Sequence, residues 1–255
     1  MPEMTTDPGP SAATTPAAAA GEEPLVSVLV AAYNEEATIE SVLRAVSAQP
    51  LRTELVVVDD GSKDSTRSLL DRLAEEGDIP GLRVLSHDRN RGKGAAVRTG
   101  IDASRGDIVV IQDADLEYDP RDLPRLLTPI LEGHADVVFG TRLRGGQPQR
   151  AHLFWHYAGN RFLSLLTNVL FNTTISDMEV GYKAFRGDLV RSLHLVSDDF
   201  AIEPELAAKI LLQREVRLYE VPISYFGRTY AEGKKITWRD GLGAVRALIR
   251  FRLQG

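Results

Sequence analysis

Three acidic side chains, Asp113, Asp115 and Glu117, stand at every second position directly after an apolar run. In an extended segment this spacing places all three carboxylates on one side of the backbone. Converging carboxylates repel one another unless a cation lies between them, and a hard divalent ion such as Mg²⁺ or Mn²⁺ prefers oxygen ligands of this kind. The other interpretation is a solvated acidic turn that Asp119 and Pro120 close. The spacing favours a metal site.

The segments that must position these carboxylates alternate between two apolar patterns from residue 25 onward. Strand-like segments span residues 26–32, 54–58, 82–85, 108–111 and 136–139, and residues 108–111 form the continuous apolar run typical of a strand buried on both faces of a parallel sheet. Apolar residues at helical spacing lie around residues 39–46, 69–73, 97–101 and 123–131. This alternation predicts an α/β fold of the Rossmann-like type, a mostly parallel sheet with helices on both faces, in a single domain.

Polar residues follow four of the expected strands, at residues 33–35, 59–62, 92–94 and 113–117. Ligands of open parallel sheets bind beyond the carboxyl ends of the strands, so these residues are expected to meet at one edge. The first strand lacks the G-x-G-x-x-G that follows it in dinucleotide-binding folds, and no Walker loop is present. A nicotinamide enzyme and a P-loop ATPase are therefore poor fits.

Composition narrows the class of protein further. The chain of 255 residues is 43% hydrophobic and 26% charged, which suits one large soluble domain. It has no cysteine, which excludes disulfides and thiolate metal sites, and its net charge of −6 argues against a nucleic-acid partner. Residues 1–24 are rich in Pro, Ala, Thr and Gly, so we expect a disordered tail without a secretory signal. No apolar stretch reaches the roughly 18 residues of a spanning helix.

Three motifs together resemble glycosyltransferase family 2: A-A-Y-N-E at 31–35, V-V-D-D-G-S-K-D-S-T at 57–66 and D-A-D-L-E at 113–117. Two later segments, D-M-E-V-G-Y-K-A-F-R at 177–186 and R-T-Y-A-E-G-K-K-I at 228–236, are similar to the dolichol-phosphate mannose synthase-like branch. That branch loads a sugar onto a polyprenyl phosphate. The resemblance runs from about residue 25 to the end, and it implies a GT-A fold, a nucleotide-sugar donor, a divalent metal and inverting chemistry.

The candidate nucleotide-sugar-binding residues lie at the strand ends: Ala32, Tyr33, Glu35, Asp60, Lys93, Asp113 and Ala114. The resemblance implies that Tyr33 and Glu35 belong to a nucleoside-binding turn and that Asp60 reads the base. Lys93 stands between two glycines, which let backbone approach a nucleotide or phosphate closely. A solvated loop lysine is the other interpretation of Lys93.

The resemblance also implies metal ligands, for which the candidates are Asp113, Asp115 and Glu117. Asp113 and Asp115 match the family's metal and ribose-diphosphate pair. Glu117 stands where the mannose synthases usually carry Gln, which leaves the donor open between GDP-mannose and a UDP-hexose. A cation that Asp115 holds would stabilise the negative charge that grows on a departing diphosphate.

Arginines and lysines are the candidates for an acceptor phosphate. A phosphomonoester has its second pKa near 6, so at neutral pH it is already an ionised nucleophile that needs cations more than a base. The candidates are Arg142, Arg161, Arg228 and Lys234. Arg142 and Arg228 match branch positions that contact lipid phosphate, while Arg161 substitutes for a second branch arginine whose slot falls near His156. Surface salt bridges are the alternative role for each.

Asp177 completes the candidate catalytic residues, which are Asp115, Arg142, Asp177 and Arg228. Relatives that glycosylate a hydroxyl use an acidic residue in this region as general base. With an ionised phosphate as nucleophile, Asp177 would instead orient an arginine or the sugar. A third interpretation is that Asp177 caps a following helical turn.

The final segment, residues 236–255, is expected to form a basic amphipathic helix after a catalytic domain over residues 25–235. Residues 214–255 contain nine Lys or Arg against four Asp or Glu. Apolar residues share one helical face and arginines another: Trp238, Leu242, Val245 and Ile249 on the first, Arg239, Arg246 and Arg250 on the second. Such a helix is typical of an anionic membrane surface, or it packs its apolar face onto the domain.

These observations favour a glycosyltransferase that moves a hexose to polyprenyl phosphate, with a divalent metal, as a peripheral protein on the cytoplasmic face of a membrane. Some branch members rely on a separate membrane-protein subunit, so such a partner is left open. Two alternatives remain: a GT-A enzyme that acts on a sugar or small-molecule hydroxyl, and a nucleotide-sugar-binding protein without turnover.

Overall fold

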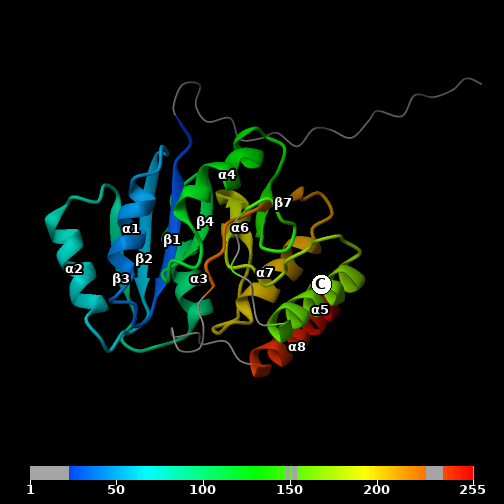
Figure 1. Ribbon diagram of the computed structural model, residues 1–255. Helices are drawn as coiled ribbons and strands as arrows, with labels where there is room; N and C mark the ends of the chain where they lie inside the picture. Colours follow the sequence, from blue (N-terminus) through cyan, green and yellow to red (C-terminus); the bar gives the residue numbers. More distant parts are fainter. Residues whose placement is uncertain (1–22, 148–149, 151–153, 228–237, 255) are drawn as a thin grey trace, which may run out of the picture.

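A computed structural model describes residues 23–147, 150, 154–227 and 238–254 (Figure 1). The tail expected over residues 1–24 lies almost wholly outside the described residues, and so do Arg228 and Lys234. Seven strands form one sheet in the order β3-β2-β1-β4-β6-β5-β7. In chain order they are β1 Val26–Ala32, β2 Thr53–Asp59, β3 Leu82–Ser86, β4 Ile108–Asp113, β5 Val137–Thr141, β6 Lys183–Arg186 and β7 Leu218–Pro222.

The sheet is mostly parallel, with one reversed strand. β1 pairs in parallel with β2 and β4, β2 with β3, and β5 with β7, whereas β6 runs antiparallel to both β4 and β5. Lys183, the first residue of β6, pairs with Ile111 near the carboxyl end of β4. The loop before β6 therefore arrives at the same edge as the carboxyl ends of the parallel strands.

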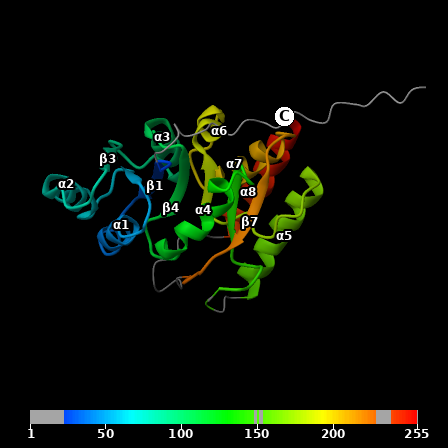
Figure 2. The same ribbon diagram turned by 90° about the horizontal axis from the view of Figure 1, so that it is seen from above.

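Helices cover both faces of the sheet. They are α1 Ile39–Ser47, α2 Thr66–Glu76, α3 Lys93–Ala103, α4 Leu123–Leu131, α5 Phe154–Phe171, α6 Gly187–Ser192, α7 Ile202–Leu211 and α8 Trp238–Gln254, with the 3₁₀ turn η1 Pro120–Asp122 before α4. Figure 2 shows α1 and α4 on one face and α3 and α6 on the other. α8 packs against α5 and α7 at one end of the sheet.

The core follows the apolar pattern that the sequence carries. All four apolar residues of α1 at helical spacing, Ile39, Val42, Leu43 and Val46, are fully buried. Removing each such side chain from water contributes roughly 1.5–3 kcal/mol, which fixes this helix onto the sheet. The segments that follow β4 and precede β6 add aromatic side chains to this core.

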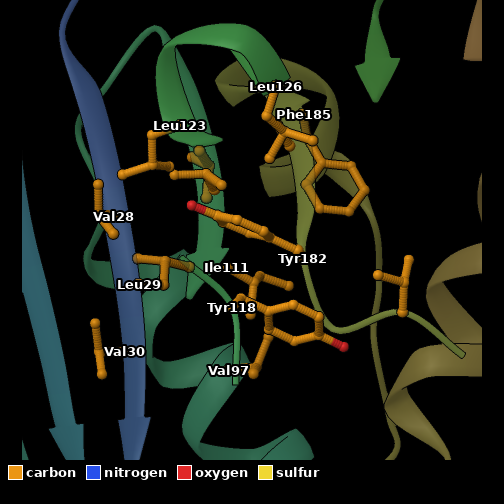
Figure 3. Packing of buried hydrophobic residues seen from close by; sticks show 14 of the residues in the cluster. Val28, Leu29, Val30, Val97, Ile111, Tyr118, Leu123, Leu126, Tyr182 and Phe185 are labelled. Atoms are coloured by element: carbon orange, nitrogen blue, oxygen red, sulfur yellow. The ribbon is translucent and has the colours of Figure 1, made fainter. Parts of the chain in front are cut away.

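Figure 3 shows this aromatic part of the core, where Tyr118 and Tyr182 belong to the same buried cluster as Ile111 and Val97. The two tyrosine ring centroids lie 5.4 Å apart. Their packing carries the core up to the edge of the sheet at which the parallel strands end.

The five expected strands and the α/β class are present, with shifts of one to a few residues at their ends. β6 and β7 have no counterpart among the expected strands. β6 has only four residues, with Lys183 and Arg186 at its ends, and β7 carries Glu220 at its centre, so neither has the mainly apolar sequence of the expected strands.

Candidate active site

A cavity of about 1270 Å³ opens at the edge where the parallel strands end. The residues proposed from the sequence for donor and metal all line it: Ala32, Tyr33, Glu35, Asp60, Lys93, Asp113, Ala114, Asp115 and Glu117. Arg142, after β5, lines it as well. We call these strand-end residues, with Arg142, the charged half of the cavity. Their assembly follows from the parallel strands, whose carboxyl ends meet at one edge.

Asp60 is tied into the protein on three sides. It accepts hydrogen bonds from the backbone N–H groups of Arg91 at 3.0 Å and Gly92 at 2.8 Å, and its Oδ1 lies 2.6 Å from Nδ1 of His87. These contacts fix the loop that leads into α3. Asp60 thus shapes the cavity wall, and its reading of the base stays a prediction.

Lys93 begins α3 and lies among carboxylates. Its Nζ is 2.8 Å from Asp113 Oδ1 and 3.1 Å from Glu203 Oε1. Burial opposes the Lys93 ammonium, but the charges of Asp113 and Glu203 outweigh burial and hold its pKa well above the usual range. Lys93 is therefore a permanent cation in the charged half, and the solvated-lysine interpretation is wrong.

The glycines beside Lys93 serve protein packing. Gly92 has a φ of +103°, and a Cβ on Gly92 or Gly94 would strike the backbone of residues 197–199. Glycine is therefore needed at these two positions because the loop before α7 packs closely against them. This loop leads to Glu203, which pairs with Lys93.

The three carboxylates after β4 do not converge as the sequence spacing suggested. Leu116 has a φ of +60°, so the segment turns and the alternation of an extended strand is lost. Asp113 accepts from Lys93, Asp115 Oδ1 accepts from the N–H of Glu117 at 3.1 Å, and Glu117 Oε2 accepts from the Tyr225 hydroxyl at 2.8 Å. Among the described residues no group of three or more His, Asp or Glu side chains is arranged to hold a metal ion. The assignment of Asp113, Asp115 and Glu117 as metal ligands stays a prediction.

The donor chemistry still fits a hard divalent ion, because every candidate ligand in the charged half is a carboxylate oxygen. Asp115 is only partly buried and lines the cavity, with Asp113 beside it in sequence and in the same cavity wall. Asp115 and Asp113 are the residues that would hold such an ion. Glu117 also lines the cavity, and its Oε2 accepts from the Tyr225 hydroxyl.

Asp177 holds Arg142 in place. Its carboxylate accepts from Nε and Nη2 of Arg142 at 2.7 Å each, from the Arg142 backbone N–H at 3.0 Å, and from Asn160 Nδ2 at 3.0 Å. Burial raises the Asp177 pKa, but Arg142 outweighs it and keeps the pKa below its usual value. Arg142 Cζ also lies 5.0 Å from the Tyr225 ring centroid.

These bonds decide between the interpretations of Asp177. Its side chain is fully buried and does not line the cavity, so it offers no base to a substrate. Its carboxylate accepts from Arg142 and Asn160, whereas capping would need the N–H groups of the turn that follows it. Asp177 is a positioning residue for Arg142. Arg161, by contrast, is exposed on α5 and does not line the cavity.

A second buried charge cluster was not assigned a role from the sequence. Lys183 at the start of β6 is fully buried and pairs with Glu203 of α7, and its Nζ lies 5.0 Å from the Phe139 ring centroid. Glu179, four residues before Lys183, lines the cavity. The signal was present, because the D-M-E-V-G-Y-K motif carries both Glu179 and Lys183 within one short loop.

Another part of the cavity lining consists mainly of apolar side chains. α5 contributes Phe154, Trp155, Tyr157 and Phe162, and α8 contributes Leu242. We call these five residues the apolar half. Trp155 is 81% exposed and Phe162 is 58% exposed. On α5 the exposed apolar surface continues beyond the cavity through Leu165 and Val169.

α8 packs by a different face from the expected one. Ala244, Leu248 and Phe251 are buried against the core and α7, whereas Leu242 and Ile249 are 52% and 44% exposed. Of the expected face, Leu242 and Val245 line the cavity and Ile249 lies at the surface, while the side chain of Trp238 is outside the described residues. Within the described part of the chain, no helix has the length and apolar character that crossing a membrane requires.

Comparison with known proteins identifies the class. Residues 27–193 match the family model described as glycosyl transferase family 2, and the chain therefore belongs to glycosyltransferase family 2. It is 33% identical over 187 residues to an undecaprenyl-phosphate 4-deoxy-4-formamido-L-arabinose transferase of Pseudomonas aeruginosa (strain LESB58), over 72% of this chain and 53% of that protein. The chain thus spans about half the length of this curated relative. It is 28% identical to an uncharacterized protein of Methanocaldococcus jannaschii, over 88% of this chain and 97% of that one.

Solved structures give the same fold. The chain is similar to glucosyl-3-phosphoglycerate synthase from Mycobacterium tuberculosis in complex with Mn²⁺, UDP and phosphoglyceric acid, with a TM-score of 0.69 and 25% identity over 90% of this chain and 78% of that one. A complex of the same synthase with Mn²⁺, UDP-glucose and phosphoglyceric acid matches with a TM-score of 0.68 and 26% identity, over 97% and 85% of the two chains. The fold is an α/β GT-A fold with a seven-stranded mixed sheet.

Proposed function

We propose that this protein transfers a hexose, with inversion, from a nucleotide-sugar to a polyprenyl phosphate. The observation that carries the proposal is the division of one cavity into a charged half and an apolar half. An acceptor with an anionic head and a hydrocarbon tail matches both halves at once, whereas a small sugar alcohol matches only the first. GDP-mannose and UDP-hexoses are both candidate donors.

In the charged half, Tyr33, Glu35 and Asp60 would contact the nucleoside, as family likeness implies. A divalent ion bound at Asp115 and Asp113 would supply positive charge to the leaving diphosphate. Lys93 adds a cation that does not depend on pH near neutrality, because Asp113 and Glu203 keep it protonated. Negative charge that develops on the leaving group is thereby stabilised where it forms.

Arg142 would hold the acceptor phosphate. Asp177 clamps its guanidinium on two nitrogens, so the group is oriented before the acceptor arrives. An ionised phosphate needs no general base, and Asp177 is buried with its oxygens already bonded to Arg142 and Asn160. This arrangement supports the phosphate acceptor over a hydroxyl acceptor activated by Asp177.

We also infer that the exposed apolar side chains of α5 and α8 rest on an anionic lipid surface. Trp155, Phe162, Leu165 and Leu242 are all more than half exposed. Arg250 lies on the surface of α8. Aromatic side chains and arginines on one surface suit the headgroup region of an anionic bilayer. In this proposal residues 25–235 form the catalytic domain, α8 extends it, and the protein is peripheral on the cytoplasmic face.

Incubation of the full chain with Mn²⁺, labelled UDP-glucose or GDP-mannose, and polyprenyl phosphate tests the proposal. We expect a chloroform-soluble sugar phosphate with one of the donors. No such product should form when the corresponding prenyl alcohol, which carries no phosphate, replaces polyprenyl phosphate. Product with 3-phosphoglycerate but none with the lipid would replace the proposal with a small-molecule acceptor. Binding of nucleotide-sugar without transfer to any acceptor would leave only a binding protein.

A further inference from the structure

Glu179 has an unusual environment for a carboxylate that lines a cavity. Its Oε1 atom is shielded from solvent and has no hydrogen-bond partner among the described residues. It lies in the loop before β6, which is held rigidly at the sheet edge. The N–H of Gly181 donates to the Tyr118 hydroxyl at 3.0 Å, and a Cβ on Gly181 would lie 2.6 Å from Asp113 Oδ2. The backbone around Glu179 therefore has little freedom to move its carboxyl away.

The neighbouring charges are already matched to one another, as three pairs: Lys93 with Asp113, Arg142 with Asp177, and Lys183 with Glu203. Glu179 is a fourth carboxyl beside these three cations and three acids. Burial and the charge of Glu203 raise its pKa to about 7, while Lys183 and Arg142 act in the opposite direction and Asp177 adds to the rise. A buried polar group without a partner costs stability, so a partner from outside the chain is the natural explanation for its presence.

Glu179 lines the same cavity as Lys93 and Asp113 on the donor side and Arg142 on the proposed acceptor side. Glu203, which also binds Lys93 on the donor side, is the strongest charge acting on Glu179, and Arg142 acts on it from the acceptor side. In an inverting displacement the transferred sugar lies between the leaving diphosphate and the nucleophile. On the proposed function, the sugar would lie in this cavity, whose lining includes Glu179.

We propose that Glu179 binds a hydroxyl group of the transferred sugar and thereby contributes to the choice of sugar. A hydroxyl both donates and accepts hydrogen bonds, so it can pair with this carboxyl in either protonation state. A phosphate oxygen would pair only with the protonated form. The inference rests on the proposed use of a nucleotide-sugar, but it does not require a lipid acceptor.

Titration calorimetry with the full chain and Mn²⁺, without any acceptor, tests the inference. UDP is compared with UDP-glucose, and GDP with GDP-mannose, on the wild type, Glu179→Ala and Glu179→Gln. We expect Glu179→Ala to weaken the nucleotide-sugar by about tenfold, the loss of one hydrogen bond to a polar side chain, and to leave the nucleoside diphosphate unchanged. Glu179→Gln should retain most of the affinity for the sugar.

Glu205→Gln is the matched control. Glu205 is also buried, but it binds the backbone N–H groups of Val196 and Ser197 and does not line the cavity. This variant should lower the melting temperature and leave nucleotide-sugar affinity unchanged. Glu179→Ala, which removes a carboxyl whose Oε1 has no partner among the described residues, should not lower the melting temperature.

Three results would overturn the inference. The first is equal weakening of nucleoside diphosphate and nucleotide-sugar by Glu179→Ala. The second is unchanged affinity for both nucleotide-sugars, including the case in which the wild type binds neither more tightly than its diphosphate. The third is abolished turnover in Glu179→Gln with unchanged affinity, which would make Glu179 a general base for a hydroxyl acceptor. Because binding is measured without acceptor, failure of the lipid-acceptor proposal would leave this test intact.

Discussion

The charged half of the cavity is built from side chains that hold one another, whereas the apolar half is built from side chains that stand exposed. Lys93, Asp113 and Arg142 each have an ionic partner inside the protein. Trp155 and Phe162 project from α5 with more than half of their surface in solvent. The charged half is thus organised before any ligand arrives, while the apolar half gains its stabilisation only when something covers it. The difference suggests that donor chemistry depends on charged groups oriented in advance. Binding of the acceptor would instead depend on burial of the exposed apolar side chains.

The largest expected effect comes from the metal ligand proposed in the charged half. Asp115→Ala should lower turnover by about a thousandfold, because a metal ion supplies several kcal/mol of charge stabilisation to the transition state. It should also abolish the enhancement of nucleoside diphosphate binding by Mn²⁺. Steady-state kinetics and calorimetry with and without Mn²⁺ check both statements. Asp71→Ala, a surface variant in α2, serves as the control, and metal-enhanced binding that persists in Asp115→Ala would contradict the assignment.

Arg142→Ala should have the next largest effect, a loss of about a hundredfold in kcat/KM for polyprenyl phosphate, comparable to removing one oriented donor from a transition state. Affinity for the nucleoside diphosphate should stay within about twofold of the wild type, because on this proposal Arg142 serves the acceptor. Arg72→Ala, an exposed ion-pair residue of α2, is the control. If nucleotide affinity falls as much as acceptor kinetics, Arg142 serves the donor and the division of roles at this residue is wrong.

The apolar half should respond differently. The double variant Trp155→Ser, Phe162→Ser should reduce partitioning onto vesicles that contain anionic phospholipid by at least about tenfold, since each exposed aromatic buries apolar area worth roughly 2 kcal/mol. Its turnover should be restored by a short-chain, water-soluble prenyl phosphate. Vesicle flotation measures the first statement. A matched variant at exposed Tyr219 of β7, Tyr219→Ser, should partition like the wild type. If the double variant partitions onto the vesicles as strongly as the wild type, α5 does not contact the membrane as proposed.

The smallest effect concerns pH. The pKa of Glu179 is raised from its ordinary value of 4.5 to about 7 in the folded protein, so the folded state binds more protons than the unfolded state between these values. The stability that this group contributes is complete below pH 4.5 and is lost as the pH rises through 7. Glu179→Gln should therefore match the wild type near pH 4.5 and melt several degrees higher at pH 8, because the glutamine carries no buried charge. Thermal melts across pH 4.5–8 check the trend, and a lower melting point for Glu179→Gln at pH 8 would contradict it.

Much of this molecule could be predicted from the sequence because the signals were local. Buried parallel strands carry continuous apolar runs, and β1 and α4 lie where those runs and the helical spacing predict them. The motifs that resemble family 2 sit at strand ends, and parallel topology alone brings those ends together. The gathering of Tyr33, Asp60 and Asp113 around one cavity required no further information.

Other features depended on contacts between distant segments, and only the tertiary structure decided them. Leu116 adopts a left-handed turn that separates the carboxylates after β4, which alternation along the sequence does not reveal. The buried face of α8 was set by α5 and α7, so Leu248 is buried while Leu242 and Ile249 stay exposed. Asp177 became a clamp because Arg142 and Asn160 reach it from β5 and α5.

The sequence by itself determined the class of fold, the edge of the sheet that carries the chemistry and the residue types gathered there, since periodicity and strand-end position are properties of short segments. The tertiary structure decided which charges are paired and which apolar faces are covered. Those outcomes depend on distance and burial, and Coulomb attraction and desolvation act between residues that the chain order keeps far apart. Glu179 shows the limit clearly, because only the tertiary structure reveals that its Oε1 is shielded and has no hydrogen-bond partner among the described residues.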